Sequence, residues 1–315
     1  MRAVRCREGR PFVDDVPRPQ GDGVLVRVDS AGICGSDLHL LGFGLPLTFG
    51  HEFAGRLADG TPVAVEPIAP CGVCDRCREG DTQLCVRGPS MVFGVGHDGG
   101  MAEECLVPAS SIVLLPSGVS TDVGCLVEPI AVSVHGVRRA GVRGTDRVAV
   151  IGGGTIGQTA VVAAQATGAS VDLLARHDRQ RDAGARLGAG EVAARPDEQG
   201  YDVVIEAAGT ATALAEAAVR CRPGGTILGL GSYWDGTIEM PGMMMSGKEL
   251  TFVPAQMYGR SGPSRDVDVA ATLLAQRPEI ADAIITHRFP LDAAVEAFET
   301  ARDRATGAIK VVLEP

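Results

Sequence analysis

The sequence contains no asparagine, and only two of its 29 basic residues are lysines, Lys248 and Lys310. Without asparagine the chain has no sequon for N-glycosylation. It has no apolar stretch as long as a membrane span, and its N-terminal region lacks the apolar run of a signal peptide. From these absences we expect a cytoplasmic protein that does not have a membrane as a partner.

Acidic residues outnumber basic ones, which gives a net charge of -10 at pH 7 and a pI of about 5.1. A surface of this sign repels polyanions, so we expect no nucleic acid among the partners. The length of 315 residues suits two domains or one large one, and a hydrophobic content of 45% is enough to bury a core. In a reducing compartment, the clustered ones among the nine cysteines are expected to be metal ligands rather than disulfides.

The pattern of apolar residues changes near Pro116. Before this point, partly alternating apolar stretches are separated by Gly, Pro and Asp, at residues 24–33, 55–65 and 102–116. Alternation with these turn residues predicts strands, so the first part of the chain is expected to be a β-rich domain.

The sequence after Pro116 is of a different kind. A helix is predicted over residues 120–141, with Ser120 as its N-cap. From residue 147 to 232, short apolar strands alternate with helices, which predicts an α/β fold with a doubly wound parallel sheet. One of these helices is expected at TALAEAAVRCRPGG, followed by a strand at TILGLGS. Residues 290–315 predict a helix and a closing strand, which we expect to return to the first domain.

A glycine-rich turn, GGGTIG, follows the strand RVAVI and begins a helix. In this context G-x-G-x-x-G predicts a dinucleotide site, in which Gly152 makes the tight turn, Gly154 lets the backbone approach a pyrophosphate and Gly157 permits close packing. The helix N-terminus offers unpaired N–H groups and partial positive charge to phosphate. The cofactor-binding residues expected here are Gly152, Gly154, Thr155, Ile156 and Gly157.

The residues after the next strand favour NADP(H) over NAD(H). An NAD site usually has Asp or Glu at the end of this strand, where the carboxylate accepts hydrogen bonds from the ribose 2′-OH. Here Ala175 stands at that point and is followed by Arg176, His177 and Arg179. Arginines pair with a 2′-phosphate, which a carboxylate would repel. The alternative is that these arginines form a solvated helix start with Asp178 as its cap.

Four cysteines lie within fifteen residues in the spacing C-x2-C-x2-C-x7-C, at Cys71, Cys74, Cys77 and Cys85. Four thiolates suit tetrahedral Zn2+ and leave no coordination position open, which is typical of a structural site. An iron–sulfur cluster is the rival, but its bacterial run continues C-x3-C-P, whereas the last gap here is longer and no proline follows Cys85. Disulfides are the weaker alternative.

A second set of ligand-type residues is spread over three segments. The set comprises Cys34, Ser36, Asp37 and His39 in GICGSDLH, His51 and Glu52 in GHEFAG, and Cys125, Glu128 and His135 in CLVEPIAVSVHG. A cysteine, a histidine and a carboxylate from such segments can form a three-ligand zinc site with the fourth position open, which is the catalytic type. Zinc in such a site polarises an alcohol or carbonyl oxygen as a Lewis acid.

Taken together, the motifs resemble the zinc-dependent medium-chain alcohol dehydrogenases, especially the branch of the sorbitol, threonine and related polyol dehydrogenases. The resemblance covers nearly the whole chain, through GICGSDLH, GHEFAG, the four-cysteine lobe, LVEPIAVSVHG, VAVIGGGTIGQ and DVVIEAAG. It implies a GroES-like catalytic domain at 1–133 with the structural zinc lobe at 71–85. A Rossmann NAD(P)-binding domain would span 134–253, and the segment 254–315 would return to the catalytic domain.

The resemblance also implies a catalytic zinc held by Cys34, His51 and Glu128, so that the chain would bind two Zn2+ in all. Cys125 is the alternative third ligand, because some relatives use cysteine there. Glu52 resembles a glutamate that can approach the zinc or replace its water ligand.

The proton path follows from the same resemblance. Ser36 would bond the alcohol and pass on its proton, His39 would deliver that proton to solvent, and Asp37 would orient the ligand His51. The expected reaction is hydride transfer between a secondary alcohol, of polyol, sugar or cyclitol type, and NAD(P)+, or reduction of the matching ketone, with NADP(H) preferred. We also expect a homo-oligomer, a dimer or a tetramer.

Two other functions stay open at this point. One is a zinc-stabilised protein that senses NADP(H) without catalysis, which would need none of Cys34, His51, Ser36 and His39. The other is an NADPH-dependent reductase of the activated double bonds of quinones or enones, but such relatives usually lack both zinc sites.

Overall fold

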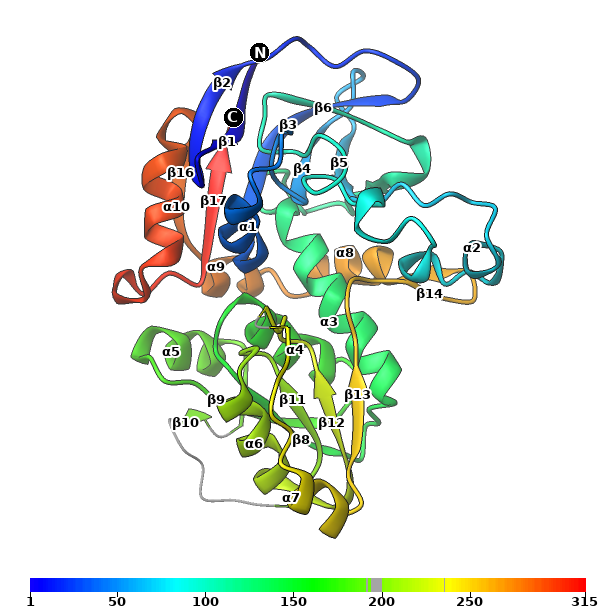
Figure 1. Cartoon of the computed structure of the whole chain (residues 1–315), viewed down its shortest axis with the longest axis vertical. Coiled ribbons are helices and arrows are strands. Elements are labelled where there is room, and N and C mark those ends of the chain that lie inside the picture. The colour runs from blue at the N-terminus through cyan, green and yellow to red at the C-terminus, as the bar shows by residue number, and fades with distance from the viewer. Residues whose placement is uncertain (191, 194–199, 235) are drawn as a thin grey trace. The chain divides into compact units, whose positions relative to one another are not determined.

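Two units, each with its own hydrophobic core, make up the computed structural model of the chain, which describes residues 1–190, 192–193, 200–234 and 236–315 (Figure 1). Unit 1 comprises Met1–Glu128 and Gly259–Pro315, and unit 2 comprises Pro129–Tyr258. The C-terminal segment therefore belongs to the same unit as the N-terminal one.

Unit 1 is built on a seven-stranded sheet. Six strands follow the order β16-β17-β3-β4-β5-β7, and the seventh strand, β6, pairs with β3 outside this order. Its strands are β3 (Val24–Ile33), β4 (Glu52–Arg56), β5 (Pro62–Val65), β6 (Glu104–Val107), β7 (Ile112–Leu114), β16 (Ile285–Pro290) and β17 (Lys310–Glu314). Two hairpins stand beside the sheet, β1 (Arg2–Arg7) with β2 (Arg10–Asp15), and β14 (Arg260–Ser261) with β15 (Ser264–Arg265).

The helices of unit 1 are mostly short. They are α1 (Gly35–Leu40), α2 (Asp75–Glu79), α8 (Asp266–Gln276), α9 (Glu279–Ile284) and α10 (Ala294–Arg302). The helix and the strand expected over 290–315 are present as α10 and β17. The first four residues of β17, KVVL, are all buried, because the strand lies between β16 and β3 inside the sheet.

Unit 2 contains a six-stranded parallel sheet with the order β10-β9-β8-β11-β12-β13 (Figure 1). The strands are β8 (Arg147–Ile151), β9 (Ser170–Leu174), β10 (Val192–Ala193), β11 (Tyr201–Glu206), β12 (Cys221–Gly229) and β13 (Thr251–Pro254). The helices are α4 (Thr155–Gln165), α5 (Asp178–Arg186), α6 (Ala211–Arg220) and α7 (Gly242–Gly247), and α3 (Val127–Ala140) crosses the boundary between the units. This order confirms the predicted doubly wound α/β sheet, and the strand order reverses between β8 and β11.

Two predicted boundaries are wrong. The helix expected from Ser120 begins only at Val127, because the Ser120 hydroxyl bonds to Asp122 and a 3-10 turn, Gly124–Leu126, comes first. The helix α6 ends at Arg220, and the CRPGG that was expected to end it is the first part of β12, where the pairing with β11 shifts register. Within the described ranges, every helix is too short or too polar to cross a membrane.

Candidate metal and cofactor sites

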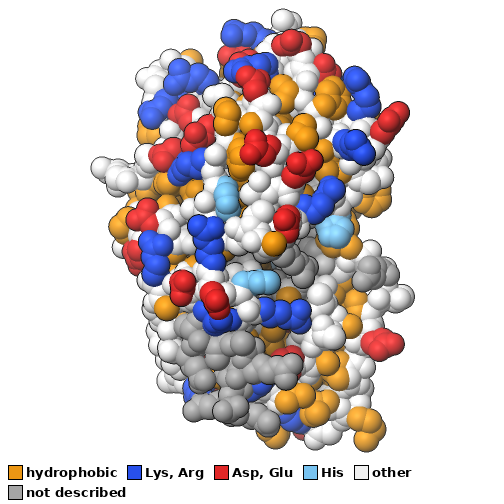
Figure 2. Space-filling model, turned by 90° about the vertical axis from the view of Figure 1, so that its left-hand side faces the viewer, with side chains coloured by type: hydrophobic (Ala, Val, Ile, Leu, Met, Phe, Trp, Pro, Cys, Tyr) orange, Lys and Arg blue, Asp and Glu red, His pale blue; other side chains and the backbone are white. Residues whose placement is uncertain are grey.

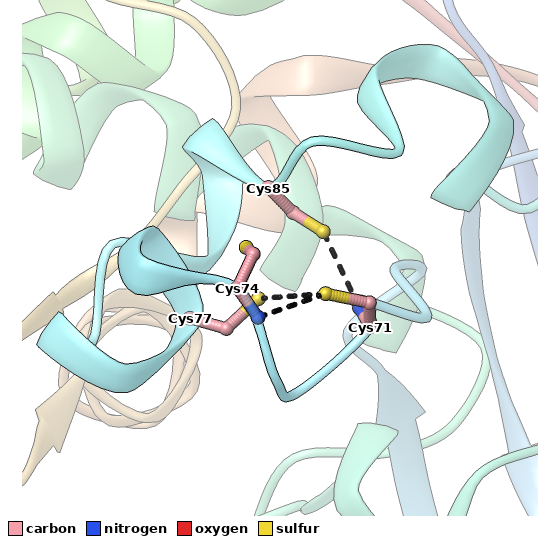
Figure 3. A group of neighbouring side chains, drawn as sticks. All are labelled: Cys71, Cys74, Cys77 and Cys85. Atoms are coloured by element: carbon pink, nitrogen blue, oxygen red, sulfur yellow. Dashed lines mark hydrogen bonds between the residues drawn. The ribbon is translucent and has the colours of Figure 1, made fainter.

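Four cysteine sulfurs lie together in the lobe around α2, which is drawn in Figure 3. The Sγ atoms of Cys71, Cys74, Cys77 and Cys85 are all within 4.8 Å of one another. Those of Cys71 and Cys77 are 3.9 Å apart. Two sulfurs that bind one tetrahedral zinc ion at about 2.3 Å are separated by about 3.8 Å. The group therefore fits a Zn2+ ion with four thiolate ligands.

Backbone N–H groups point at these sulfurs. The N–H of Cys71 donates to Sγ of Cys85, and the N–H of Cys74 donates to Sγ of Cys71, both at 3.3 Å (Figure 3). Hydrogen bonds from the N–H groups of Val86 and Cys77 lower the pKa of the Cys74 thiol to about 6, whereas burial raises the pKa of the Cys77 thiol to about 12. Such bonds favour the thiolate, which is the form that binds zinc. All nine cysteines lie in the described ranges and are free thiols rather than disulfides.

A cysteine, a histidine and a carboxylate meet where two neighbouring strands of unit 1 lie side by side. Cys34 follows β3 and is the N-cap of α1, while His51 and Glu52 stand at the start of β4. The register of β3 and β4 places Gly32 opposite Glu52, so the two segments deliver their side chains to one place. Single ligand atoms of Cys34, His51 and Glu52 lie within 4.8 Å of one another.

The ring of His51 lies between two polar side chains of α1. Its Nδ1 is 3.4 Å from Oδ1 of Asp37, and its Nε2 is 3.3 Å from Oγ of Ser36. Asp37 is fully buried, and its other oxygen accepts the N–H of Cys34 at 2.9 Å. Burial by itself lowers the pKa of His51, but the charges of Asp37 and Cys34 raise it well above its usual value. The same negative field attracts a cation to this place, so the donor set fits a zinc ion.

Glu128 and Cys125, the two candidates for a third ligand, are buried but lie outside this group of three. Glu128 is in the first turn of α3, where burial raises its pKa to about 8 and the charge of His51 opposes the shift. Cys125 lies just before α3, and burial raises its pKa to about 11. The carboxylate that joins the cysteine and the histidine in this structure is that of Glu52.

The two residues expected to move a proton both belong to α1. Ser36 is half-buried beside His51, and His39 is exposed in the last turn of the helix. Residues three apart on a helix lie on the same face, so α1 presents the hydroxyl and the imidazole along one side.

Lys310 is a charged residue of this site that no sequence motif identifies. Its Nζ lies 2.5 Å from Oε2 of Glu52 and 3.0 Å from the carbonyl oxygen of Ile33. Both charged side chains are almost completely buried. Lys310 is the first residue of β17, which pairs with β3. The only signal in the sequence is that lysine is so rare in it.

The glycine turn of unit 2 has the geometry of a phosphate cradle. Gly152 has φ of +111°, a conformation that favours glycine, and a Cβ on Gly157 would lie 1.7 Å from the carbonyl oxygen of Gly152. Gly154 is the N-cap of α4, and a Cβ there would meet no atom within 4 Å, so the backbone is open at that residue. Thr155 and Ile156 form the first turn of α4 and are half-buried. The turn therefore fits the pyrophosphate of a dinucleotide.

The residues after β9 carry positive charge at the surface. Ala175 is buried, and Arg176, His177 and Arg179 are exposed. The N-cap of α5 is His177, and Asp178 is the first helical residue, where it pairs with Arg181. The expectation that Asp178 is the cap is thus wrong, although the arginines are exposed at the start of a helix, as that alternative expects.

A buried carboxylate at the carboxyl end of β11 organises two loops of unit 2, although no sequence motif identified its role. Oε1 of Glu206 accepts the N–H groups of Ala208 and Gly209, both at 2.8 Å, and Oε2 accepts the hydroxyl of Tyr233 at 2.6 Å. The side chain of Glu206 has no exposed surface. It therefore fixes the turn after β11 to the segment after β12, beside the strand-order reversal where α/β sheets bind ligands.

Acidic and basic side chains are interspersed on the face shown in Figure 2, with no extended area of one sign among the described residues. Several arginines pair with carboxylates, such as Arg56 with Asp29 at 3.0 Å and Arg222 with Asp202 at 2.6 Å. This face lacks the basic stripe that is typical of nucleic-acid-binding proteins.

A hollow of about 540 Å³ in unit 1 lies apart from the metal groups. Its walls include Arg5, Arg18, Phe93, His97 and Glu104, and neither metal group contributes to it. The ring of His97 contacts that of Phe93, so this histidine belongs to the hollow rather than to a metal site.

Comparisons with known proteins find relatives over nearly the whole chain. Two family models match, the alcohol dehydrogenase GroES-like domain over residues 20–117 and the glucose dehydrogenase C-terminus over residues 121–314. The chain is 29% identical to L-galactonate-5-dehydrogenase of Escherichia coli K12, over 95% of this chain and 94% of that protein. It is 31% identical to sorbitol dehydrogenase of Homo sapiens, over 90% of this chain and 87% of that protein. A structure from Sinorhizobium meliloti, described as a zinc-binding dehydrogenase bound to NADP, matches with a TM-score of 0.86 at 31% identity, over 100% of this chain and 99% of that one.

Proposed function

Because the chain belongs to the zinc-dependent medium-chain alcohol dehydrogenases, in the branch of the polyol dehydrogenases, we propose a specific reaction for this NAD(P)-dependent enzyme. It would transfer hydride between a secondary alcohol of polyol, sugar or cyclitol type and NADP+, or reduce the matching ketone with NADPH. One observation carries this proposal: unit 1 holds a mixed cysteine, histidine and carboxylate group as well as a separate four-cysteine group. The first has the donors of a catalytic zinc site, and the second those of a structural one.

Two zinc ions per chain are part of the proposal. Cys71, Cys74, Cys77 and Cys85 would hold the structural ion, with every coordination position filled by sulfur. Cys34 and His51 would hold the catalytic ion, with Glu128 as third ligand and Glu52 close by. A zinc ion there would polarise the oxygen of the alcohol or carbonyl substrate.

The proton of the alcohol would leave along α1. Oγ of Ser36 lies 3.3 Å from the His51 ring, so a substrate hydroxyl beside the ligand histidine is within reach of Ser36. His39 follows three residues later on the same helix and is exposed, so it can exchange the proton with water. Asp37, buried and facing Nδ1 of His51, would hold the ring in place.

The cofactor would bind at the turn between β8 and α4, where the open backbone at Gly154 leaves room for a pyrophosphate. The nicotinamide supplies or accepts the hydride. Two features support NADP(H) as the preferred form: Ala175 stands where a carboxylate would repel a 2′-phosphate, and Arg176 and Arg179 are exposed directly after it. The NADP in the structure from Sinorhizobium meliloti, which is that protein's own ligand, is in keeping with this preference.

Sugar-derived alcohols are the proposed substrates because the relatives named above act on sorbitol and on L-galactonate, as their names state. Both are polyhydroxylated chains in which a secondary alcohol is a possible site of oxidation. A screen of alditols, aldonates and cyclitols with NADP+, and of ketoses with NADPH, would test the class. Turnover only of simple primary alcohols would contradict it. The expected dimer or tetramer stays a prediction, which light scattering can check.

Metal analysis tests the two sites separately. We expect two zinc ions per wild-type chain, one in a Cys34→Ser variant with alcohol oxidation lost, and one in a Cys74→Ser variant with the mixed group intact. Cys105→Ser is the matched control, because this buried thiol belongs to neither group and should leave both ions in place. An active Cys34→Ser enzyme, or one with unchanged zinc content, would show that the catalytic assignment is wrong.

A further inference from the structure

Both lysines of the chain donate more than one hydrogen bond from Nζ. Nζ of Lys248 donates to the carbonyl oxygens of Ala218, Val219 and Cys221, at 3.0, 2.7 and 2.7 Å, at the end of α6. Three bonds in different directions suit a compact ammonium group and not a planar guanidinium. These carbonyls lie where a helix end leaves acceptors without partners inside the helix. The bonds thus give Lys248 a purely structural role.

Lys310 donates two hydrogen bonds, to acceptors of two kinds. It binds one carbonyl, that of Ile33, and one carboxylate, that of Glu52. Ile33 is the last residue of β3 and directly precedes Cys34, and Glu52 directly follows His51. The ammonium group is therefore joined to both segments that deliver ligand atoms to the mixed group.

Glu52 also packs closely against β3. Its side chain lies across β3, so closely that a Cβ on Gly32 would be 2.2 Å from Oε2. Only a glycine opposite Glu52 in the register leaves room for this arrangement. The carboxylate thus lies against the backbone of β3 and accepts a hydrogen bond from Lys310 there.

The carboxylate of Glu52 also has a competing partner. One of its oxygens is within 4.8 Å of the ligand atoms of Cys34 and His51, so a cation between those two would attract it. Burial of a carboxylate without a counter-ion costs free energy. If the charge of Lys310 is removed, the carboxylate of Glu52 is therefore attracted to the nearest remaining positive charge. Lys310 and a metal ion would therefore compete for the same side chain.

We propose that Lys310 is a positioning residue of the catalytic metal site, which holds Glu52 against β3 and so keeps the fourth coordination position free for substrate. The inference rests on the proposed function, because it assumes that Cys34 and His51 bind zinc.

The test compares full-length wild type with Lys310→Met, which keeps the length of the side chain and removes its charge. In this variant Glu52 is released toward the metal and would add a carboxylate ligand, so we expect zinc release from the mixed group to a chelator to be about 10-fold slower, equivalent to about 1.4 kcal/mol. With Co2+ in both sites, the visible ligand-field bands should change, once the spectrum of Cys34→Ser is subtracted to remove the four-thiolate site. We also expect kcat to fall.

Lys248→Met is the matched control, because it removes the other lysine and weakens the fold without touching the metal group. It should leave zinc release and the cobalt bands as in wild type. In the double variant Lys310→Met with Glu52→Gln, both measurements should equal those of Glu52→Gln alone, since no carboxylate is left to restrain. If Lys310→Met does not fold, Lys310→Gln serves instead, because its amide can donate to the Ile33 carbonyl without a charge.

The inference is overturned if zinc release from Lys310→Met is unchanged or faster, if its cobalt bands match wild type, or if the double variant still releases zinc slowly. These outcomes are separate from failure of the proposed function. If Cys34→Ser holds as much zinc as wild type, the catalytic site itself is misassigned; if it holds one ion fewer and Lys310→Met behaves as wild type, only the role of Lys310 is wrong.

Discussion

Two glycines of the turn between β8 and α4 should respond to the same substitution in opposite ways. A Cβ on Gly157 would lie 1.7 Å from the carbonyl oxygen of Gly152, whereas real Cβ contacts are essentially never shorter than 3.0 Å. The obstructing atom belongs to the backbone, so it cannot rotate away. A Cβ on Gly154 meets nothing within 4 Å, and its φ of -73° is open to alanine. Gly157→Ala must therefore push α4 from β8, and Gly154→Ala need not move anything.

The size of the effect follows from two opposing terms. Overpacking in a close-packed interior costs typically 1–3 kcal/mol, and a backbone obstruction belongs near the upper end, about 3 kcal/mol. Replacing glycine by alanine inside a helix returns about 1 kcal/mol. We thus expect Gly157→Ala to lower the free energy of unfolding of unit 2 by about 2 kcal/mol. At Gly154 the substitution removes a favourable N-cap residue, but alanine also lowers the conformational entropy of the unfolded chain. The two effects partly cancel, so the free energy of unfolding should change by no more than about 1 kcal/mol.

The assay uses Trp234, the only tryptophan of the chain, which lies in unit 2 and reports its unfolding in urea by fluorescence. For the affinity for NADPH we expect the reverse order, in which Gly154→Ala has a larger effect than Gly157→Ala. The methyl group of Gly154→Ala would stand between the backbone and the pyrophosphate, so affinity should fall about 10-fold, equivalent to about 1.4 kcal/mol. If Gly157→Ala unfolds at the same urea concentration as wild type, or if Gly154→Ala binds NADPH normally, the assignment of the two glycines is wrong.

Three further variants test other parts of unit 2. Arg176→Ala combined with Arg179→Ala should weaken NADPH binding by about 10-fold or more and leave NADH binding unchanged, because only NADPH offers a 2′-phosphate to a charge-assisted hydrogen bond. A fluorescence titration measures both affinities, and equal losses for the two cofactors would refute this expectation. Lys248→Met should lower the urea midpoint by an amount that corresponds to about 2 kcal/mol, since three carbonyls lose a charged donor at a half-buried site. Tyr233→Phe should cost about 1–2 kcal/mol by the same measurement, because Oε2 of the buried Glu206 loses its hydroxyl donor, and an unchanged midpoint would show that water replaces that bond.

The parts of the fold that depend on short sequence patterns could be predicted from the sequence. The alternation of apolar strands and helices gives the parallel sheet of unit 2, because each element must bury one face against its neighbours. The glycine turn could be predicted because its three glycines lie within six residues of the chain, so that the pattern is local. The four-cysteine metal group could be predicted equally well, since its ligand atoms come from one short lobe.

Element boundaries were less predictable where a side chain or a bulge decided them. Ser120 has the residue type of an N-cap, but its hydroxyl bonds to Asp122 in a turn, and the helix begins at Val127. The segment CRPGG has the residue types of a helix stop and a loop. In the structure it runs into β12, which tolerates Pro223 because the pairing with β11 is shifted there. Both outcomes depend on neighbours that lie outside a local window.

The mixed metal group shows why a site can be only partly predicted. Motifs identified Cys34, His51 and Glu52, but which carboxylate stands nearest the other two is set by the register of β3 and β4. The contact from Lys310 joins residues 258 positions apart and exists only because β17 lies beside β3. A lone lysine at the start of a strand has no local pattern that would reveal such a partner.

The place of β17 in the sheet gives the C-terminal strand a role at the metal site as well as in the core. It lies between β16 and β3, so its removal would expose an edge of β3 at Ile33, the residue before Cys34. The same strand supplies the ammonium group that neutralises Glu52 in a fully buried place. Strand pairing fixes the backbone that carries the cysteine, and Lys310 fixes the carboxylate beside it. The sheet of unit 1 is therefore complete only with β17, whose residues follow the whole of unit 2 in the sequence.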